Sequence, residues 1–166
     1  MKLEKCFYAE HNDLFFLDGT ECPVMSGTLR TEDGNLPDST FFMTMGIICL
    51  EITWKQVGLN EESYNESFLA ALRDSLKKLE AMQVYVFICP LAGEEALDTP
   101  EAKDAFIASM NHCARRIKDC KVVAGFAVPS NVDAAQFITE LSKKHSHYIF
   151  FSNDESLLAD GSIVRY

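Results

Sequence analysis

A carboxylate inside an otherwise apolar segment is the first residue of this sequence whose chemistry stands out. Glu51 lies in the run IICLEITW (47–54) among aliphatic and β-branched neighbours. Alternate side chains of a strand share a face, so Cys49, Glu51 and Thr53 point the same way. A carboxylate held there could act as a general base or accept hydrogen bonds from sugar hydroxyls. The alternative is a structural glutamate satisfied by a neighbouring N–H or by water, as buried polar groups usually are.

Two candidate partners for Glu51 come far along the chain. Asp154 and Glu155 follow the segment YIFFS (148–152), which has the composition of a buried strand. Hydrolysis of a glycoside needs two carboxylates across the scissile bond. If the two strand ends lie near each other, Glu51 with Asp154 or Glu155 would form an acid/base pair for a small glycoside or for another hydrolysis.

Three uncharged residues also stand where apolar runs end. Trp54, the single tryptophan, could stack on a sugar, or it could fill the core, since tryptophan buries a large area. Ser130 and Asn131 follow the run VVAGFAVP (122–129) and offer a hydroxyl and an amide, which bind ligands without acting as acid, base or nucleophile. Their alternative role is to cap the next helix, because Ser and Asn are favoured N-cap residues.

The six cysteines and four histidines predict no metal site. No two cysteines have Cys-x-x-Cys spacing, and His145 and His147 would not share a helix face. Cys49 and Cys89 lie inside apolar runs, where cysteine acts as a small hydrophobe, so free thiols are expected. A thiol or redox function of Cys49 or Cys89 is the alternative. Because glycine-rich phosphate-binding motifs are also absent from the sequence, we expect no cofactor.

The bulk composition narrows the class of partner. The chain has 166 residues, 25 of them acidic and 15 basic, and a net charge of −10. This charge repels phosphate and anionic lipid, so nucleic acid and membrane surfaces are poor candidates. No apolar run approaches the ~18 residues of a membrane span, and the first residues lack the apolar core of a signal peptide. We expect one cytoplasmic domain over residues 1–166.

The order of the remaining segments predicts a parallel sheet. Nearly continuous apolar runs are typical of strands buried on both faces, and apolar residues at helical spacing separate them. Such alternation implies right-handed crossovers between parallel strands. The predicted strands are 47–54, 84–91, 122–128 and 148–152, and the predicted helices are 63–81, 99–118 and 131–144.

The ends of the chain have a different pattern. Two short apolar stretches flank His11-Asn12-Asp13, a turn-forming sequence, and predict a hairpin. A short strand ending at Gly27 and a brief helix over 38–46 follow. Ser63 with Glu66, and Ser130 with Asp133, have the spacing of capping boxes for later helices. The tail after residue 152 predicts a turn and one short strand.

These segments, in this order, resemble the cellulase-like glycoside hydrolases of family five. LFFLDGTECPVMSGTL resembles the opening hairpin and first barrel strand of those enzymes, and MGIICLEITWKQV resembles their second strand. YNESFLAALRDSLKKLEAMQVYVFICPL and AFIASMNHCARRIKDCKVVAGFAVPSN are similar to the segments that end in the third and fourth strands. The resemblance covers residues 14–152 and implies an α/β fold, a partial TIM barrel of about five parallel (β/α) units with an N-terminal hairpin. The alternative is a generic parallel α/β domain.

The departures from the family matter most for function. Asn131 stands where the family has its acid/base glutamate, and Ser130 where it has the preceding asparagine. Cys49 replaces an arginine of the second strand, and no seventh strand supplies the nucleophile. The resemblance therefore implies a catalytically degenerate relative that acts as a carbohydrate- or protein-binding or assembly module. Its expected ligand-binding residues are Trp54, Glu51, Ser130 and Asn131.

An incomplete barrel also predicts self-association. Five strands cannot close a barrel whose shear and tilt are set for eight. The open concave face would be apolar, and soluble proteins rarely expose large apolar patches. We expect a homodimer, with the alternative that the hairpin and the tail SLLADGSIVRY (156–166) cover this face within one chain.

Overall fold

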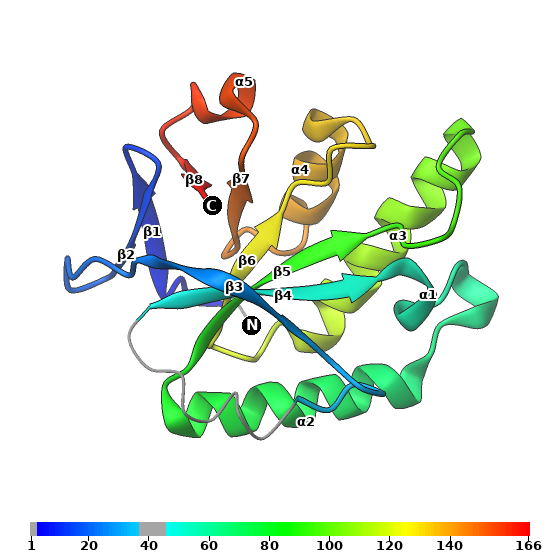
Figure 1. Cartoon of the computed structure of the whole chain (residues 1–166), viewed down its shortest axis with the longest axis horizontal. Helices are drawn as coiled ribbons and strands as arrows, with labels where there is room; N and C mark the ends of the chain where they lie inside the picture. Colours follow the sequence, from blue (N-terminus) through cyan, green and yellow to red (C-terminus); the bar gives the residue numbers. More distant parts are fainter. Residues whose placement is uncertain (1–2, 37–45) are drawn as a thin grey trace.

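A six-stranded parallel sheet forms the centre of the computed structural model, which describes residues 3–36 and 46–166 (Figure 1). Neighbours in the sheet are also neighbours in the sequence, which is the strand order of a (β/α) barrel. The sheet curls into a half-barrel. The predicted fold class is thus confirmed, with six strands in place of about five. The strands are β3 (Val24–Arg30), β4 (Ile47–Thr53), β5 (Tyr85–Leu91), β6 (Val123–Ala127), β7 (Ile149–Ser152) and β8 (Ile163–Arg165).

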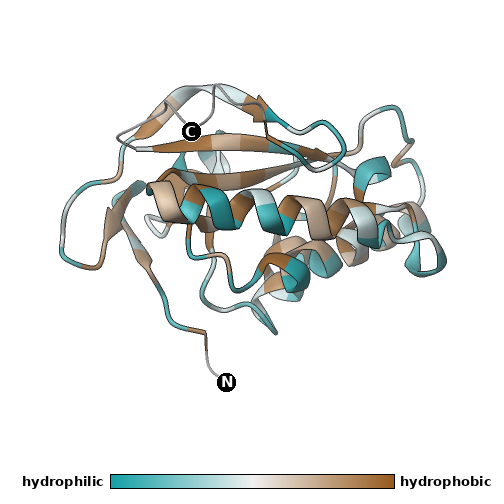
Figure 2. Ribbon diagram, turned by 90° about the horizontal axis from the view of Figure 1, so that it is seen from below, coloured by the Kyte–Doolittle hydropathy of each residue, from teal (hydrophilic) through white to brown (hydrophobic). Residues whose placement is uncertain are grey.

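Three long helices cover the convex face of the sheet (Figures 1 and 2). They are α2 (Glu66–Met82), α3 (Pro100–Ile117) and α4 (Ala134–Ser142), with the shorter α1 (Trp54–Val57), η2 (Glu61–Ser63) and α5 (Glu155–Leu158) between other elements. All four predicted strands and all three predicted helices are present. The strand expected to end at Gly27 continues to Arg30. A brief helix is also expected over 38–46. Residues 38–45 lie outside the described residues, so that only Gly46 of this segment is described.

Two of the helix starts differ from the predicted capping boxes. The N-cap of α2 is Asn65, whose side chain accepts from the Phe68 N–H at 3.0 Å, while Ser63 belongs to the preceding 3₁₀ turn. The N-cap of α4 is Asp133, which accepts from the Gln136 N–H at 2.7 Å. In both cases an Asn or Asp nearer the helix satisfies the orphan N–H groups of the first turn.

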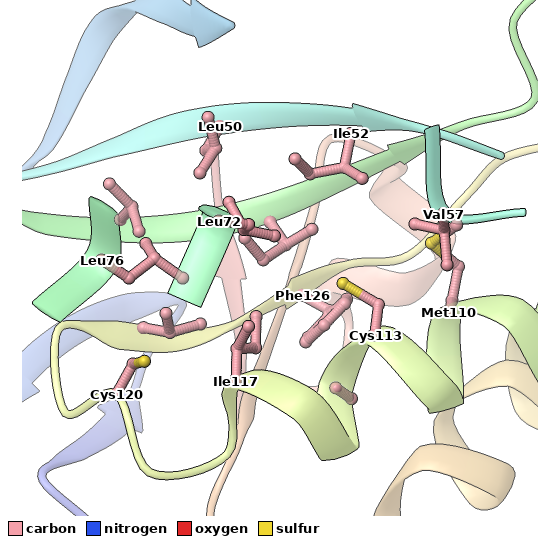
Figure 3. Packing of buried hydrophobic residues seen from close by; sticks show 14 of the residues in the cluster. Leu50, Ile52, Val57, Leu72, Leu76, Met110, Cys113, Ile117, Cys120 and Phe126 are labelled. Atoms are coloured by element: carbon pink, nitrogen blue, oxygen red, sulfur yellow. The ribbon is translucent and has the colours of Figure 1, made fainter. Parts of the chain in front are cut away.

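The main core lies between the sheet and these helices (Figure 3). Strand residues such as Leu50, Ile52 and Phe126 pack against helix residues such as Leu72 and Met110, and all five are completely buried. Burying each such side chain contributes about 1.5–3 kcal/mol of transfer free energy. Among the described residues, no helix combines the length and the apolar character needed to cross a membrane.

A second cluster fills the concave face of the sheet and is covered by the N-terminal hairpin, β1 (Phe7–Glu10) and β2 (Asp13–Phe16). Phe7 and Leu14 of the hairpin pack against Phe87 and Phe151 of the sheet. The hairpin turn is tied to β8 through Asn12, whose backbone N–H donates to the Gly161 carbonyl at 3.0 Å. The Asn12 amide donates to two further carbonyls in the same region, at 2.7 and 2.9 Å. The chain thus covers much of its own concave face.

Cys49 and Cys89 form a disulfide between the adjacent strands β4 and β5, with their Cα atoms 6.1 Å apart. The expectation that both are free thiols is therefore wrong. Both side chains lie on the concave side. In the register of the parallel sheet Cys89 pairs with Glu51, which is two residues after Cys49 on β4. The other cysteines are free: Cys6, Cys22, Cys113 and Cys120.

Candidate ligand-binding site

A pocket of about 200 Å³ lies at the carboxyl ends of β5 to β8. In (β/α) barrels this edge carries the active site, because loops from successive strands meet there. The pocket is lined by Cys89, Pro90, Leu91 and Ala92 after β5, by Ala127 to Asn131 after β6, by Asn153 after β7 and by Tyr166 after β8. Two of the predicted ligand-binding residues, Ser130 and Asn131, are therefore brought to one site.

The side chains of Ser130 and Asn131 are not used as helix caps. Asp133 has that role, and neither side chain has a hydrogen-bond partner within residues 3–36 and 46–166. The carbonyl of Phe151 accepts from the Val128 N–H at 2.8 Å and fixes the loop where it leaves the sheet. Their hydroxyl and amide are thus available to a ligand in the pocket.

Asn153 and Tyr166 are site residues that the sequence analysis missed. Tyr166 is 41% exposed, and its ring meets Phe87 edge-on with centroids 5.1 Å apart. Burial, and then the negative charge of Glu51, raise the pKa of the Tyr166 hydroxyl, so it remains a donor at neutral pH. The signal for both was their position directly after an apolar segment, FFS before Asn153 and SIVR before Tyr166.

Glu51 lies beside this site rather than in its lining. Its side chain is 22% exposed, and its carboxylate accepts from the Arg30 Nε at 2.6 Å, across neighbouring strands. This contact corresponds to the structural alternative, in which a neighbouring N–H satisfies the glutamate. Its negative charge still affects the pocket, because it raises the pKa of the Tyr166 hydroxyl.

The two carboxylates proposed as partners of Glu51 have other contacts. Asp154 caps α5 by accepting from the Ser156 N–H at 2.9 Å. Glu155 forms an ion pair with Arg165, at 2.5 and 3.2 Å. Hydrogen bonding in both cases lowers the pKa of the carboxyl. Because β5 and β6 lie between β4 and β7, the sheet order does not make Glu51 a neighbour of either residue.

Trp54 lies on the opposite face of the sheet from the concave cluster. Its indole is 5% exposed, packs edge-on against Phe106 and donates from Nε1 to the Ser109 Oγ at 3.1 Å. The ring therefore has no exposed face for a sugar, and its position corresponds to the core alternative. No group of three or more His, Cys, Asp or Glu in the described part of the chain is placed to hold a metal ion.

Comparisons with known proteins give structural matches only. No protein-family model matches the chain, and no curated protein matches its sequence. Exo-beta-1,4-mannosidase Op5Man5 from Opitutaceae bacterium strain TAV5 superimposes with a TM-score of 0.60 and 11% identity over 92% of this chain and 34% of that one. Endoglucanase Cel5A from Pseudomonas stutzeri does so with a TM-score of 0.53 and 16% identity, over 70% and 44%.

The chain spans less than half the length of both solved proteins. Identities this low establish the fold and not the activity. The chain therefore has a glycoside-hydrolase-like fold, and its parallel strands and helices match part of a (β/α) barrel.

Proposed function

We propose that this chain binds a neutral carbohydrate at the carboxyl edge of its sheet and does not hydrolyse it. The observation that carries the proposal is the meeting of Ser130, Asn131, Asn153 and Tyr166 in one pocket. Hydroxyl and amide groups match the hydrogen-bonding groups of a sugar, and an aromatic ring offers an apolar face for stacking. The pocket is smaller than the ~300–1,000 Å³ of typical small-molecule sites. This size is suited to a single sugar ring of a longer ligand.

Binding without turnover follows from the lining of the pocket. No Asp or Glu is among its described lining residues, and Asn131 stands where the resemblance places the acid/base glutamate. An amide cannot protonate a leaving oxygen. The carboxylates of Glu51 and Glu155 form ion pairs with Arg30 and Arg165, respectively. The chain is on this basis a degenerate glycoside-hydrolase-like binding module.

The names of the structural neighbours indicate which sugars to test first. One is an endoglucanase and the other an exo-β-1,4-mannosidase, so cellotriose and mannotriose are suitable probes. Titration calorimetry and amide chemical shifts would measure binding. We expect millimolar affinity, with shifts confined to residues 89–92, 127–131, 153 and 166. The Asn131→Ala variant should weaken binding about tenfold, since one hydrogen bond contributes about 0.5–1.5 kcal/mol.

Matched variants separate a binding effect from a loss of structure. Ser130→Ala is a second site variant and should also weaken binding. Its control is Ser146→Ala, which changes an exposed serine in the α4–β7 loop at the other edge of the sheet. Tyr8→Phe in the hairpin is the control for Tyr166→Phe. No shift with either trisaccharide, or equal losses in variants and controls, would contradict the proposal.

The alternative of an active hydrolase has a distinct result. Turnover of 4-nitrophenyl β-glucoside or β-mannoside that disappears in Glu51→Gln would show that Glu51 is catalytic. We expect no turnover by the wild-type chain. We also expect none from Asn131→Glu, because one carboxylate cannot serve as both nucleophile and acid.

A further inference from the structure

A second pocket, of about 290 Å³, lies at the opposite edge of the sheet, near the amino end of β6. The N-terminal segment forms one side of it through Cys6 and Phe7. The loop between α3 and β6 forms another side, with Lys118 and Lys121 at the opening, and His147 contributes from the loop before β7. This pocket shares no lining residue with the proposed carbohydrate site.

The walls of this second pocket are apolar. Phe7, Val123 and Ala124 are buried hydrophobic residues of the sheet and hairpin. The Cys6 and Cys120 thiols add to this surface, since burial raises the pKa of each and keeps it uncharged. No Ser, Thr, Asn, Gln or Tyr is among the described lining residues. The uncharged part of the lining is therefore mainly hydrophobic and suits the hydrocarbon part of a ligand.

The opening of the pocket is positively charged. The Lys118 and Lys121 ammonium groups form no ion pair with any residue in the described ranges, and both side chains are exposed. Two carboxylates, Glu4 and Asp119, also line the pocket. The charge of Asp119 is balanced by Arg73, at 2.5 Å, and by Lys77, at 3.9 Å. Lys118 and Lys121 therefore outnumber the remaining acid, Glu4, in a chain whose net charge is −10.

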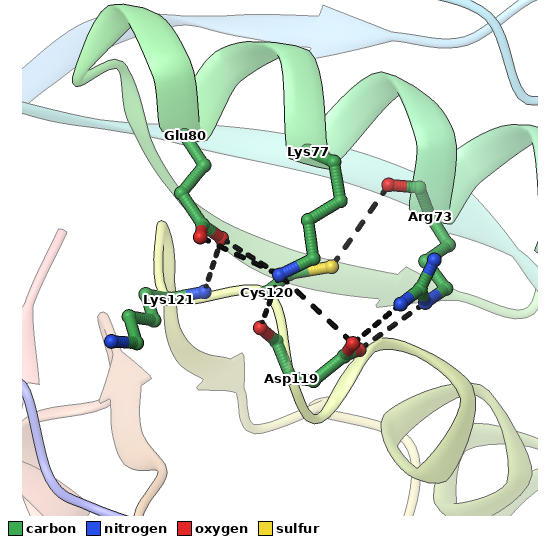
Figure 4. Close-up of polar contacts among 6 residues, drawn as sticks. All are labelled: Arg73, Lys77, Glu80, Asp119, Cys120 and Lys121. Atoms are coloured by element: carbon green, nitrogen blue, oxygen red, sulfur yellow. Dashed lines mark hydrogen bonds and ion pairs between the residues drawn. The ribbon is translucent and has the colours of Figure 1, made fainter.

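The same contacts hold the lysine-bearing loop in place (Figure 4). Lys77 of α2 donates to the Asp119 carbonyl at 2.6 Å, and the Lys121 backbone N–H donates to Glu80 at 2.9 Å. Figure 4 shows the Lys121 side chain directed away from this network, with no contact drawn at its ammonium group. The loop is fixed by its backbone and by Asp119, which leaves the Lys121 charge available for a ligand.

We propose that this second pocket binds a small amphipathic carboxylate. Its hydrocarbon part would lie against Phe7, Val123 and Ala124, and its carboxylate would lie at Lys118 and Lys121. An organic cation would be repelled by the two lysines, which outnumber the remaining acid of the lining. This inference does not depend on the proposed carbohydrate site.

The test uses octanoate as the probe and octanamide as its neutral counterpart. We expect octanoate to shift the amide signals of residues 3–7, 118–124 and 147 and to bind at least fivefold more tightly than octanamide. Lys121→Gln should weaken octanoate binding about threefold to fivefold, and Lys118→Gln/Lys121→Gln about tenfold. Lys55→Gln, an exposed lysine of α1 beyond the carboxyl end of β4, is the matched control and should leave the affinity unchanged.

The Cys6 thiol gives an independent readout. Cys6 is half-buried at the pocket, whereas Cys22, Cys113 and Cys120 are buried. Octanoate at ten times its Kd should slow alkylation of Cys6 by iodoacetamide about tenfold, as followed by peptide mass spectrometry. Octanoate should slow it less in Lys118→Gln/Lys121→Gln at the same concentration.

Four results would overturn the inference. Equal affinity for octanoate and octanamide would show that Lys118 and Lys121 do not bind the carboxylate. An equal loss in Lys55→Gln would indicate a general charge effect. Saturating shifts without protection of Cys6 would place the ligand elsewhere. A chain that binds cellotriose but not octanoate would retain the carbohydrate proposal and lose this one.

Discussion

Phe87 and Phe151 stack with their ring centroids 4.2 Å apart on the concave face, although strand β6 lies between the strands that carry them. Gly125 of β6 pairs with Phe87 in the sheet, and the next concave position of that strand is Ala127, which pairs with Phe151. Small residues on the intervening strand allow the two rings to meet above it. The contact joins β5 to β7 directly and stabilises the curl of the half-barrel.

Gly125→Ala should destabilise the chain strongly, because a Cβ at this position would overlap the backbone carbonyl of Ile149. We expect a loss of about 3 kcal/mol in the free energy of unfolding, measured with urea. Gly161→Ala is the control, since its Cβ would meet its nearest atom, the His11 N, at an ordinary 3.5 Å. Equal stability of the two variants would contradict this account of β6.

The disulfide between Cys49 and Cys89 should be found as a linked peptide in a digest made without reductant. It closes a loop with a sequence separation of 40, so its removal should cost about 2–4 kcal/mol. The variant Cys49→Ser/Cys89→Ser should be insensitive to reductant, whereas reductant should destabilise the wild-type chain. Unlinked peptides, or an equal response of both chains to reductant, would argue against the bridge.

Stability should fall on acidification because of His147. Burial lowers the pKa of this imidazole to about 4, and the positive charge of His145 and Lys5 adds to the effect, against a backbone contact with Lys118 that raises the pKa. A lowered pKa means that the unfolded chain binds the proton more readily. The stabilisation is present above pH ~6.5, the unfolded value, and is lost as the pH falls toward 4.

This pH dependence can be measured by urea unfolding between pH 7 and pH 4. We expect His147 to account for about 2 kcal/mol of the loss, allowing for its partial exposure. His147→Gln should flatten the curve in this window. His11→Asn, at a ring that is 90% exposed, is the control and should leave the curve unchanged.

Replacing Trp54 should affect stability and not binding. Trp54→Phe removes the hydrogen bond to Ser109 and part of a buried ring, so we expect a loss of about 2 kcal/mol in the free energy of unfolding. Affinity for cellotriose or mannotriose should stay within twofold. A variant of normal stability with lost sugar binding would instead place Trp54 in the site.

The mass in solution tests the homodimer expected from the sequence. That expectation depended on an open concave face, but Phe87 and Phe151 are fully buried beneath the hairpin. The hairpin thus covers this face within one chain, which is the alternative to a dimer. We expect light scattering to give a mass near 18.6 kDa across a tenfold dilution. Twice that mass would support the dimer.

The parts of the fold that repeat a long pattern could be predicted from the sequence. Helix α3 has Thr99 as N-cap and Pro100 at its first turn, and β4 is a continuous apolar run, so local signals and burial agree. Strand β8 is only three residues long, too short to show a period. The Cys49–Cys89 contact depends on the register of two strands, which no local pattern determines.

The candidate site could be predicted only in part, because local patterns identify strand ends but not which strand ends meet. Ser130, Asn131 and Asn153 each follow a strand whose end could be identified, whereas Tyr166 follows the short strand β8. The meeting of all four residues in one pocket depends on tertiary structure. The position of Trp54 could have been inferred. If Glu51 and Thr53 share the concave face, alternation places Trp54 on the other face, among the helices.

The attachment of Asn12 to the segment around β8 also affects how the chain folds during synthesis. The hairpin is made before its partner segment, because Asp160, whose carbonyl accepts from the Asn12 amide, lies 148 residues later. At ~5–20 residues per second, roughly seven to thirty seconds pass before the ribosome supplies that partner. Throughout this interval Phe7 and Leu14 have no complete surface to pack against. The nascent hairpin is therefore the segment that we expect a ribosome-associated chaperone to bind.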